Sequence, residues 1–269
     1  MLIYIRLDYN IILTYVNLLF IYIVVKMRLK ITNNYSPNFS VLKRKYEFIK
    51  FIVIHYTGMR NENAAIKRLC DENRNVSAHY FIKNNGEMIN LIPDLYVAWH
   101  AGKSKWLNYN SLNKSSIGIE IQNPGHENKY KNFSTKQLSS LKILLRTLIK
   151  KYKIDLKNIL GHSDIAPERK KDPGEKFPWK NLAHHKLAIW HSLKESSLKK
   201  NRKIRLNKDE EIIFIKNLNK IGYRIIKRLN FNLNKKFITT AFQRRFRQNL
   251  VNGIPDQECF LISKNLLKS

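Results

Sequence analysis

A proline-rich segment in the second half of the chain constrains the fold more than any other stretch. Residues 160–179 read LGHSDIAPERKKDPGEKFPW, with a short apolar run that ends at Gly161. The run predicts a strand, and the prolines that follow exclude a long helix, so the segment is expected to be an ordered loop that folds back on itself. Asp172 would then return toward His162. An imidazole and a carboxylate brought together in this way are two of the three protein ligands of an open zinc site.

A buried strand supplies a candidate for the third ligand. Residues 51–57, FIVIHYT, form a β-branched and aromatic run that is typical of a strand buried on both faces, with His55 near its end. Taken alone, such a histidine is more often a hydrogen-bonded core residue. His162 and Asp172 taken alone are equally consistent with an ordinary hydrogen-bonded pair in a surface loop. Together the three side chains predict a metal site with one position left open for water.

The neighbouring sequence predicts a scaffold of strands and helices. In order, the expected elements are a helix over 61–71, a hairpin with strands 78–82 and 88–92 around Asn85-Gly86, a strand over 116–121, a capped helix from Ser134 to Tyr152, a strand over 158–160 and a helix over 179–193. The strand SIGIEI places Gly118 and Glu120 on one face. A carboxylate on a buried strand is costly unless it is paired or close to a metal, so Glu120 belongs either to a structural salt bridge or to the site.

These motifs resemble those of zinc-dependent N-acetylmuramoyl-L-alanine amidases related to peptidoglycan-recognition proteins. The resemblance is carried by GHSDIAP, R-K-x-D-P-G and FPW in residues 161–179, by W-H-A-G-x-S-x-W at 99–106 and by SIGIE at 116–120. It implies an α/β fold with a central mixed β-sheet flanked by helices. It also implies that His55, His162 and Asp172 bind Zn²⁺, although their ligand types do not exclude iron or nickel.

The resemblance assigns further roles. Glu120 would lie beside the zinc-bound water as general base, and Lys170, two residues before the metal aspartate, would stabilise the oxyanion. The zinc would lower the pKa of its water toward about 7 and polarise the amide carbonyl. Lys170 is otherwise one more solvated cation in a charged run. Glu168 departs from the family pattern, in which a small residue often follows Ala-Pro.

The segment 98–106 is expected to be a loop with two readings. It is either a packed loop with a structural histidine or, as the resemblance implies, one wall of the substrate groove. The residues that would line this wall are Trp99, His100, Ser104 and Trp106.

The implied reaction is hydrolysis of the amide bond between N-acetylmuramic acid, or its anhydro form, and L-alanine in peptidoglycan or muropeptides. The alternative is a catalytically silent peptidoglycan-recognition protein, which would keep the groove but lack a ligand or the base. All five of the proposed ligands and catalytic residues are present. The net charge of +30 would also suit nucleic acid. The chain has no zinc finger, helix-turn-helix or RNA-binding aromatic signature, and its Lys, Asn and Ile content is what an AT-rich genome imposes, so no nucleic-acid partner is expected.

The ends of the chain carry separate expectations. Residues 11–25 are uncharged and apolar, short of the roughly 20 residues of a membrane span but suited to a signal sequence or anchor. They predict membrane association and a periplasmic or cell-envelope location, or a cytoplasmic one if translation begins at Met27. Near the other end, AFQRRF at 241–246 followed by G-I-x-D at 253–256 resembles a small peptidoglycan-binding domain. Without that resemblance the region is a basic helical appendage.

The resulting organisation has five parts and is expected to be monomeric. They are a signal- or anchor-like segment (1–27), a linker (28–48), the catalytic domain (49–194), a second linker (195–206) and a small C-terminal domain of three helices (207–269). Cys70 and Cys259 lie far apart in sequence and are expected to be two ordinary buried thiols.

Overall fold

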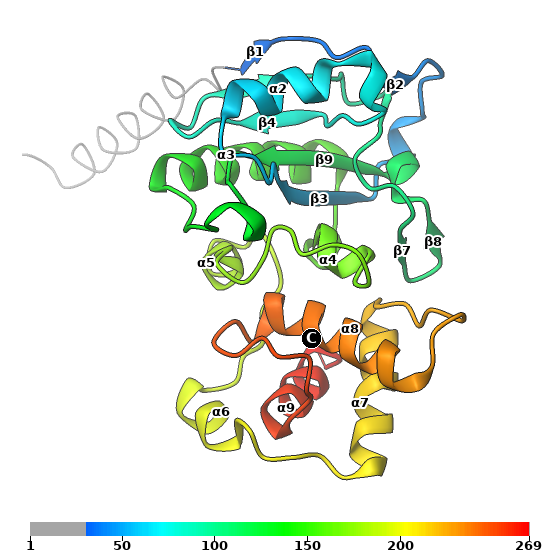
Figure 1. Ribbon diagram of the computed structural model, residues 1–269, viewed down its shortest axis with the longest axis vertical. Coiled ribbons are helices and arrows are strands. Elements are labelled where there is room, and N and C mark those ends of the chain that lie inside the picture. The colour runs from blue at the N-terminus through cyan, green and yellow to red at the C-terminus, as the bar shows by residue number, and fades with distance from the viewer. Residues whose placement is uncertain (1–30, 269) are drawn as a thin grey trace, which may run out of the picture.

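A six-stranded mixed sheet organises the computed structural model, which describes residues 31–268; the apolar stretch 11–25 lies outside the described residues. In spatial order the strands are β1 (Ile31–Asn33), β5 (Met88–Asn90), β4 (Tyr80–Ile82), β9 (Ser116–Ile121), β3 (Phe51–Tyr56) and β10 (Ile159–Gly161) (Figure 1). Neighbouring strands run parallel except β4 and β5, which form the predicted hairpin. The predicted mixed sheet is therefore confirmed.

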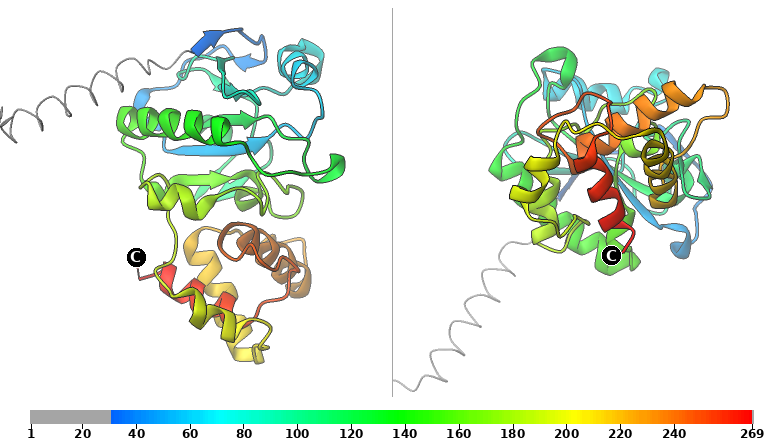
Figure 2. Two further views of the ribbon diagram at one scale, coloured as in Figure 1. Left: turned by 90° about the vertical axis from the view of Figure 1, so that its left-hand side faces the viewer. Right: turned by 90° about the horizontal axis from the view of Figure 1, so that it is seen from below.

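One face of the sheet is covered by the long helix α3 (Thr135–Tyr152). The predicted capping box is formed: the Ser134 hydroxyl accepts from the backbone of Gln137, whose side chain bonds back to the Ser134 backbone. The buried leucines of α3 pack against Ile52 and Ile54 of β3 and against the isoleucines of β9. The view in Figure 2 (left) shows α3 lying along this face.

A buried carboxylate ties α3 to the sheet. Asp94 accepts hydrogen bonds from Lys151 at 2.8 Å, Tyr152 at 2.6 Å and Tyr80 at 2.7 Å. Burial by itself raises the pKa of Asp94, but these three donors outweigh it and hold the pKa below the ordinary value of 3.8. The ionised form of Asp94 therefore stabilises the folded state.

The second face of the sheet is covered by two separate bodies. Over β4 and β5 lies α2 (Glu62–Cys70), through Ala65 and Leu69. Over β3 and β10 lie the C-terminal helices, which bury Phe51, Val53 and Leu160. Because side chains alternate along a strand, the next outward residue of β3 after Val53 is His55, which faces this side of the sheet.

The segment 28–48 was predicted to be a linker, and this prediction is wrong for its described residues, 31–48. Its strand β1 extends the central sheet, and β2 (Phe39–Ser40) pairs with β6 (Val97–Ala98). Its polar side chains are buried where they satisfy backbone groups: Arg44 donates to the carbonyls of Asp94, Asn113 and Ser116. The polar composition therefore did not predict an exposed linker, because these polar groups form hydrogen bonds inside the fold.

Four helices follow the sheet in the C-terminal region. They are α6 (Glu195–Asn201), α7 (Lys208–Ile221), α8 (Phe231–Phe246) and α9 (Gln257–Leu266), and they lie together below the sheet in Figure 1. The prediction of a linker over 195–206 is wrong, since α6 occupies it and buries Leu198. The helix predicted over 179–193 is also too long: α5 (Trp179–His184) ends before Lys186, which adopts a left-handed conformation.

The C-terminal helices share a core with the sheet. Phe214, Phe242 and Ile238 belong to the same buried cluster as Phe51 and Val53 of β3. Polar groups also cross the junction. Arg245 of α8 is almost fully buried and donates to the carboxylate of Asp164 at 2.7 Å and to the carbonyl of Ile159 at 2.9 Å. The C-terminal region is therefore fastened to the strand and turn that lead into the proline-rich loop.

Trp106 makes a further contact across this junction. It lies in β7 (Lys105–Trp106), which pairs with β8 (Tyr109–Asn110) as a short hairpin below the sheet. Its indole packs edge-on against Tyr223, at a centroid distance of 5.0 Å. A Cβ on Gly222 would meet the same indole at 2.3 Å, so only glycine allows this approach.

Candidate active site

The three predicted metal ligands come together on the second face of the sheet. His55 lies near the end of β3, and His162 opens the short helix α4 (His162–Ile165) directly after β10. Because β3 and β10 are parallel neighbours, their carboxyl ends meet at one edge. The loop returns as predicted, with the Ser163 amide donating to the carbonyl of Asp172 at 2.8 Å.

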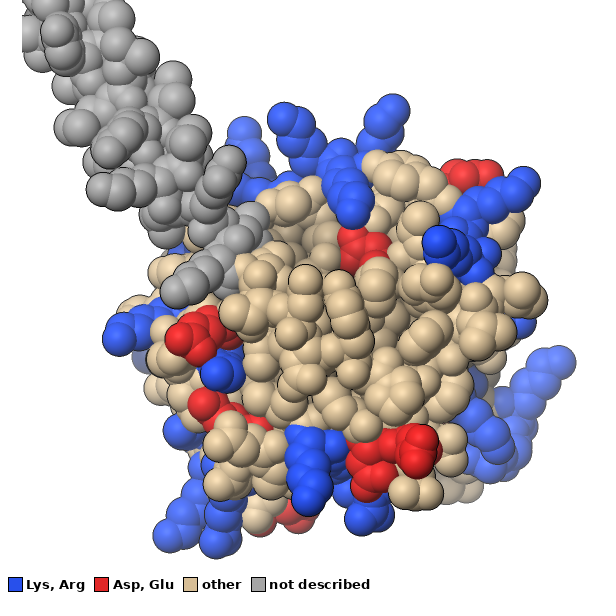
Figure 3. Space-filling view, turned by 90° about the horizontal axis from the view of Figure 1, so that it is seen from above, with Lys and Arg blue, Asp and Glu red and all other residues tan. Residues whose placement is uncertain are grey.

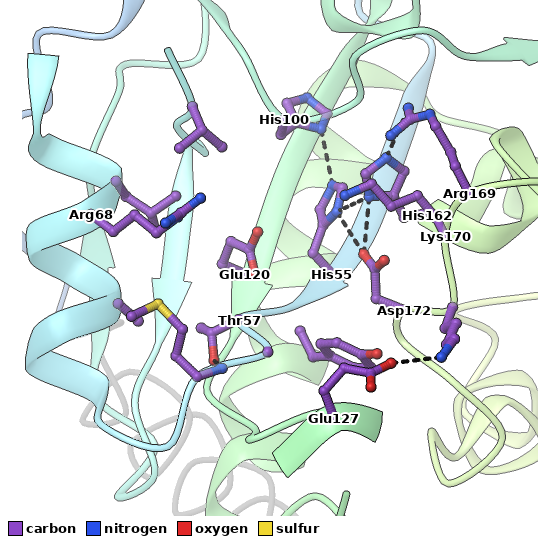
Figure 4. A pocket seen from close by; sticks show the side chains of 17 residues that line it. His55, Thr57, Arg68, His100, Glu120, Glu127, His162, Arg169, Lys170 and Asp172 are labelled. Carbon is purple, nitrogen blue, oxygen red and sulfur yellow. Dashed lines mark hydrogen bonds and ion pairs between the residues drawn. The ribbon is translucent and has the colours of Figure 1, made fainter. Parts of the chain in front are cut away.

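The ligand atoms of the three residues form a compact triangle (Figure 4). His55 Nδ1 lies 2.9 Å from His162 Nδ1, and each lies 3.0 Å from Asp172 Oδ2. All three residues are buried. Burial, followed by the neighbouring His162, lowers the pKa of His55 to about 4. Burial alone would raise the pKa of Asp172, but the two histidines hold it well below 3.8.

This donor set fits a metal cation. Two imidazole nitrogens and a carboxylate oxygen facing one another at 2.9–3.0 Å concentrate lone pairs in one place, and a single proton can bridge only one pair of them. Two histidines and one carboxylate with an open fourth position are a ligand set that zinc takes in hydrolytic sites. The described residues therefore suit the ion that the sequence motif implies.

Glu120 lies beside the triangle without a salt bridge. It is the register partner of His55 on the adjacent strand β9. Its Oε2 atom is buried and has no hydrogen-bond partner among the described residues, so the alternative of a structural ion pair is not supported. Burial, followed by the charge of Asp172, raises the pKa of Glu120 to about 8, against an opposing effect of Lys170. A cation at the triangle would lower that pKa and favour the carboxylate.

A cavity of about 370 Å³ opens over these groups, between α2 and the proline-rich loop. Glu120, Lys170 and the three ligand residues all line it (Figure 4). Lys171 also reaches its rim, but its ammonium group is bound to Glu127 at 2.6 Å. Lys170 lines the cavity and has no ion pair among the described residues.

The residues expected to form a groove wall take different positions. His100 lines the cavity, whereas Trp99, Ser104 and Trp106 do not. The indole of Trp99 donates to Ser40, and the Ser104 hydroxyl accepts from the Leu112 amide within its own loop. Trp99, Ser104 and Trp106 therefore lie outside this cavity, and their substrate-lining role stays a prediction.

Two arginines of the cavity were not anticipated. Arg169 donates to the carbonyls of Ala101 and Lys103, tying the proline-rich loop to the loop that carries His100. Its place in the R-K-x-D-P-G motif was a usable signal. Arg68 lines the opposite wall from α2 (Figure 4). Nothing distinguishes it in sequence from the many other basic residues of the chain.

One cleft thus holds the His55, His162 and Asp172 cluster together with Glu120 and Lys170, which have no ion pair among the described residues, and this combination is typical of a hydrolase site. Comparison with known proteins specifies the class. A family model described as N-acetylmuramoyl-L-alanine amidase (Amidase_2) matches residues 45–175. N-acetylmuramoyl-L-alanine amidase AmiD of Escherichia coli K12 is 32% identical over 235 residues, which cover 83% of this chain and 84% of AmiD. The chain belongs to the N-acetylmuramoyl-L-alanine amidase family.

Solved structures agree with this assignment. A complex of E. coli AmiD with the substrate anhydro-N-acetylmuramic acid-L-Ala-D-γ-Glu-L-Lys superposes with a TM-score of 0.73 at 30% identity, covering 85% of this chain and 92% of that one. AmpDh3 from Pseudomonas aeruginosa superposes with a TM-score of 0.71 at 27% identity, covering 85% and 94%. The expected fold and the expected hydrolysis of the bond between N-acetylmuramic acid and L-alanine are confirmed.

Proposed function

We propose that this amidase is zinc-dependent and that His55, His162 and Asp172 hold the ion. The observation that carries the proposal is the triangle of ligand atoms at 2.9–3.0 Å beside Glu120 Oε2, which has no partner among the described residues. Zinc bound there would supply a Lewis acid that polarises the amide carbonyl and acidifies a water molecule. The alternative of a silent recognition protein is disfavoured, because neither a ligand nor the base is missing.

The chain's own residues then move the protons of the reaction. In this proposal Glu120, whose Oε2 has no hydrogen-bond partner among the described residues, takes a proton from water as the remaining hydroxide adds to the carbonyl carbon. The same carboxyl group returns that proton to the nitrogen of L-alanine as the C–N bond breaks. Lys170, which lines the cavity and has no ion pair among the described residues, offers its ammonium group to the developing oxyanion.

We propose muropeptides, including the anhydro form, as substrates. Support comes from the AmiD complex, whose ligand is an anhydro-N-acetylmuramic acid peptide, and from the 92% of that chain that is covered. A cell-envelope location and a polymer-holding role for residues 207–269 are further proposals. They are supported by the apolar stretch 11–25, the basic composition and the AFQRRF motif. Cell fractionation and sacculus pull-down with the full chain test these two proposals.

Metal removal tests the central proposal. The full chain is freed of metal with a chelator, zinc is verified absent by elemental analysis, and release of L-alanyl peptide from an anhydro-muropeptide is followed by mass spectrometry. We expect activity to disappear and to return when one equivalent of zinc is added. Circular dichroism should change little, because the sheet and helices bury a core of their own. Full activity in the metal-free protein would refute zinc dependence.

A further inference from the structure

We propose that His100 is a positioning residue that fixes the tautomer of His55 through a relay ending at a backbone carbonyl, and so presents the His55 Nδ1 lone pair to the metal. The inference rests on the zinc site proposed above. It replaces the substrate-contacting role that the sequence suggested for His100.

The relay begins at the Ser116 hydroxyl, whose hydrogen-bond direction is fixed. The Ser116 hydroxyl donates its only proton to the carbonyl of Leu112, at 2.5 Å. The Ser116 oxygen lies 3.2 Å from His100 Nε2, and with its proton already used it can only accept there. His100 Nε2 therefore carries a proton.

The proton position in His100 determines that in His55. His100 is 6% exposed and makes no ion pair with a carboxylate among the described residues, so its ring carries one proton. With that proton on Nε2, His100 Nδ1 is an acceptor, and it lies 3.0 Å from His55 Nε2. His55 Nε2 must then be the donor. The remaining nitrogen, His55 Nδ1, keeps a free lone pair, and it is the atom that faces His162 and Asp172.

The tautomer of His162 is fixed directly by a backbone carbonyl, without an intervening histidine. Its Nε2 lies 3.2 Å from the carbonyl of Ala101, which can only accept, so His162 Nδ1 also keeps its lone pair. Arg169 lies at 3.4 Å from the same nitrogen but makes its closer contact with the Ala101 carbonyl. Both ligands are thus oriented by two consecutive residues of one loop.

Two features hold these consecutive residues in place. The side-chain oxygen of Asn113 accepts from the amides of His100 and Ala101, at 3.1 and 2.6 Å. Under the imidazole, Gly118 of β9 leaves the necessary room: a Cβ there would lie 2.4 Å from His100 Cγ. Gly118 has an ordinary strand conformation, so the space for His100 is what its missing side chain provides.

The test compares His100→Asn with His100→Leu in the full chain. The two replacements have the same shape, but only Asn keeps an oxygen near the Nδ1 position that can accept from His55. Zinc affinity is measured by competition with a chromogenic chelator. We expect Asn to stay within about threefold of wild type and Leu to bind roughly 10- to 100-fold more weakly, the usual range for a partner behind a ligating histidine.

A matched control separates this role from general packing. His79 is another fully buried histidine, 5.6 Å from His100 between ring centroids, and it contacts Arg44, Tyr96 and the Gly118 amide but no ligand. His79→Leu should lower thermal stability while leaving zinc affinity within about threefold. Equal zinc affinities for the Asn and Leu variants at position 100, or a loss at His79→Leu as large as at His100→Leu, would overturn the proposal.

A second readout needs no metal. In the metal-free protein, ¹⁵N-resolved NMR of the imidazole nitrogens should show His55 protonated at Nε2, and Ser116→Ala should convert this single tautomer into a mixture. A His55 ring that lacks a proton on Nε2 in the wild-type protein would refute the relay. If the wild-type chain binds no zinc, the proposed function fails, while this spectrum still decides whether the relay exists.

Discussion

Removing the charge of Arg245 tests whether the C-terminal helices are part of the active-site scaffold. The guanidinium group joins α8 to Asp164, two residues beyond the proposed ligand His162. Their side chains are 2% and 1% exposed. The Asp164 carboxylate also accepts from the Tyr223 hydroxyl at 2.7 Å and from the Gly161 amide at 2.8 Å. One carboxylate therefore connects the C-terminal region, the end of β10 and the turn that carries His162.

Arg245→Met should be strongly destabilising. Methionine keeps an apolar stem to pack on Trp179, over which the guanidinium now lies at 4.6 Å. It leaves Asp164 as a buried carboxylate without its cation. Breaking a buried pair from one side costs about 3–5 kcal/mol, because the remaining charge loses compensation but stays out of water. We expect a loss in this range in the free energy of unfolding, measured by urea denaturation with tryptophan fluorescence.

The comparison pair at the same junction is Arg224 and Glu168, whose side chains are 21% and 10% exposed. Both of these side chains are more exposed than Arg245 and Asp164, so Arg224→Met should cost less than Arg245→Met. A double-mutant cycle of Arg245→Met with Asp164→Asn should recover about 2 kcal/mol relative to the sum of the single changes. A loss below about 1 kcal/mol for Arg245→Met, or a coupling near zero, would refute this account of the junction.

Four further outcomes are expected. Glu120→Gln should retain zinc but lose at least roughly 100-fold in turnover, measured on an anhydro-muropeptide, because it removes the proton acceptor; unchanged turnover would exclude it as the base. Lys170→Ala should slow turnover by a similar factor, whereas Lys171→Ala, which breaks only a rim ion pair, should be mild; the reverse order would reassign the oxyanion role. The stability lost in Asp94→Asn should be constant from pH 7 to 5, begin to shrink near the ordinary pKa of 3.8 and vanish once the pH is below the depressed pKa of folded Asp94, because the hydrogen-bond donors stabilise only the ionised form; a loss independent of pH would contradict this. A chain ended after Ser197 should lose its cooperative thermal transition, because the shared core is cut; a wild-type-like transition would show an independent catalytic unit.

Local sequence signals predicted the catalytic scaffold well. The strand with His55, the capped helix α3 and the proline-rich return toward Asp172 each depend on short-range rules: periodicity, capping and the exclusion of helix by proline. The spacing of the ligands in three dimensions follows, because β3 and β10 are parallel neighbours. The errors arose where polar residues are buried. The segment 31–48 looks like a linker in composition, yet its polar groups satisfy backbone carbonyls inside the fold.

The high positive charge is a second feature of the composition that does not identify a binding partner. On the face shown in Figure 3, Lys and Arg side chains project around the outline, and acidic groups lie among them, with an uncharged surface between. This arrangement differs from the continuous basic stripe expected of a nucleic-acid groove. On that face the charge is dispersed, as a compositional bias would distribute it.

The helical periodicity of α8 is enough to predict that its arginine, Arg245, is buried. Arg245 stands seven, four and three residues after Ile238, Ala241 and Phe242, all of which are fully buried. On a helix these positions form one stripe, so an arginine there is placed in the apolar core and requires a buried acceptor. The pattern alone predicts the burial of Arg245 and the need for an anion. It cannot name Asp164, because that partner lies 81 residues earlier in the chain and reaches Arg245 only after the sheet and the C-terminal helices have packed together.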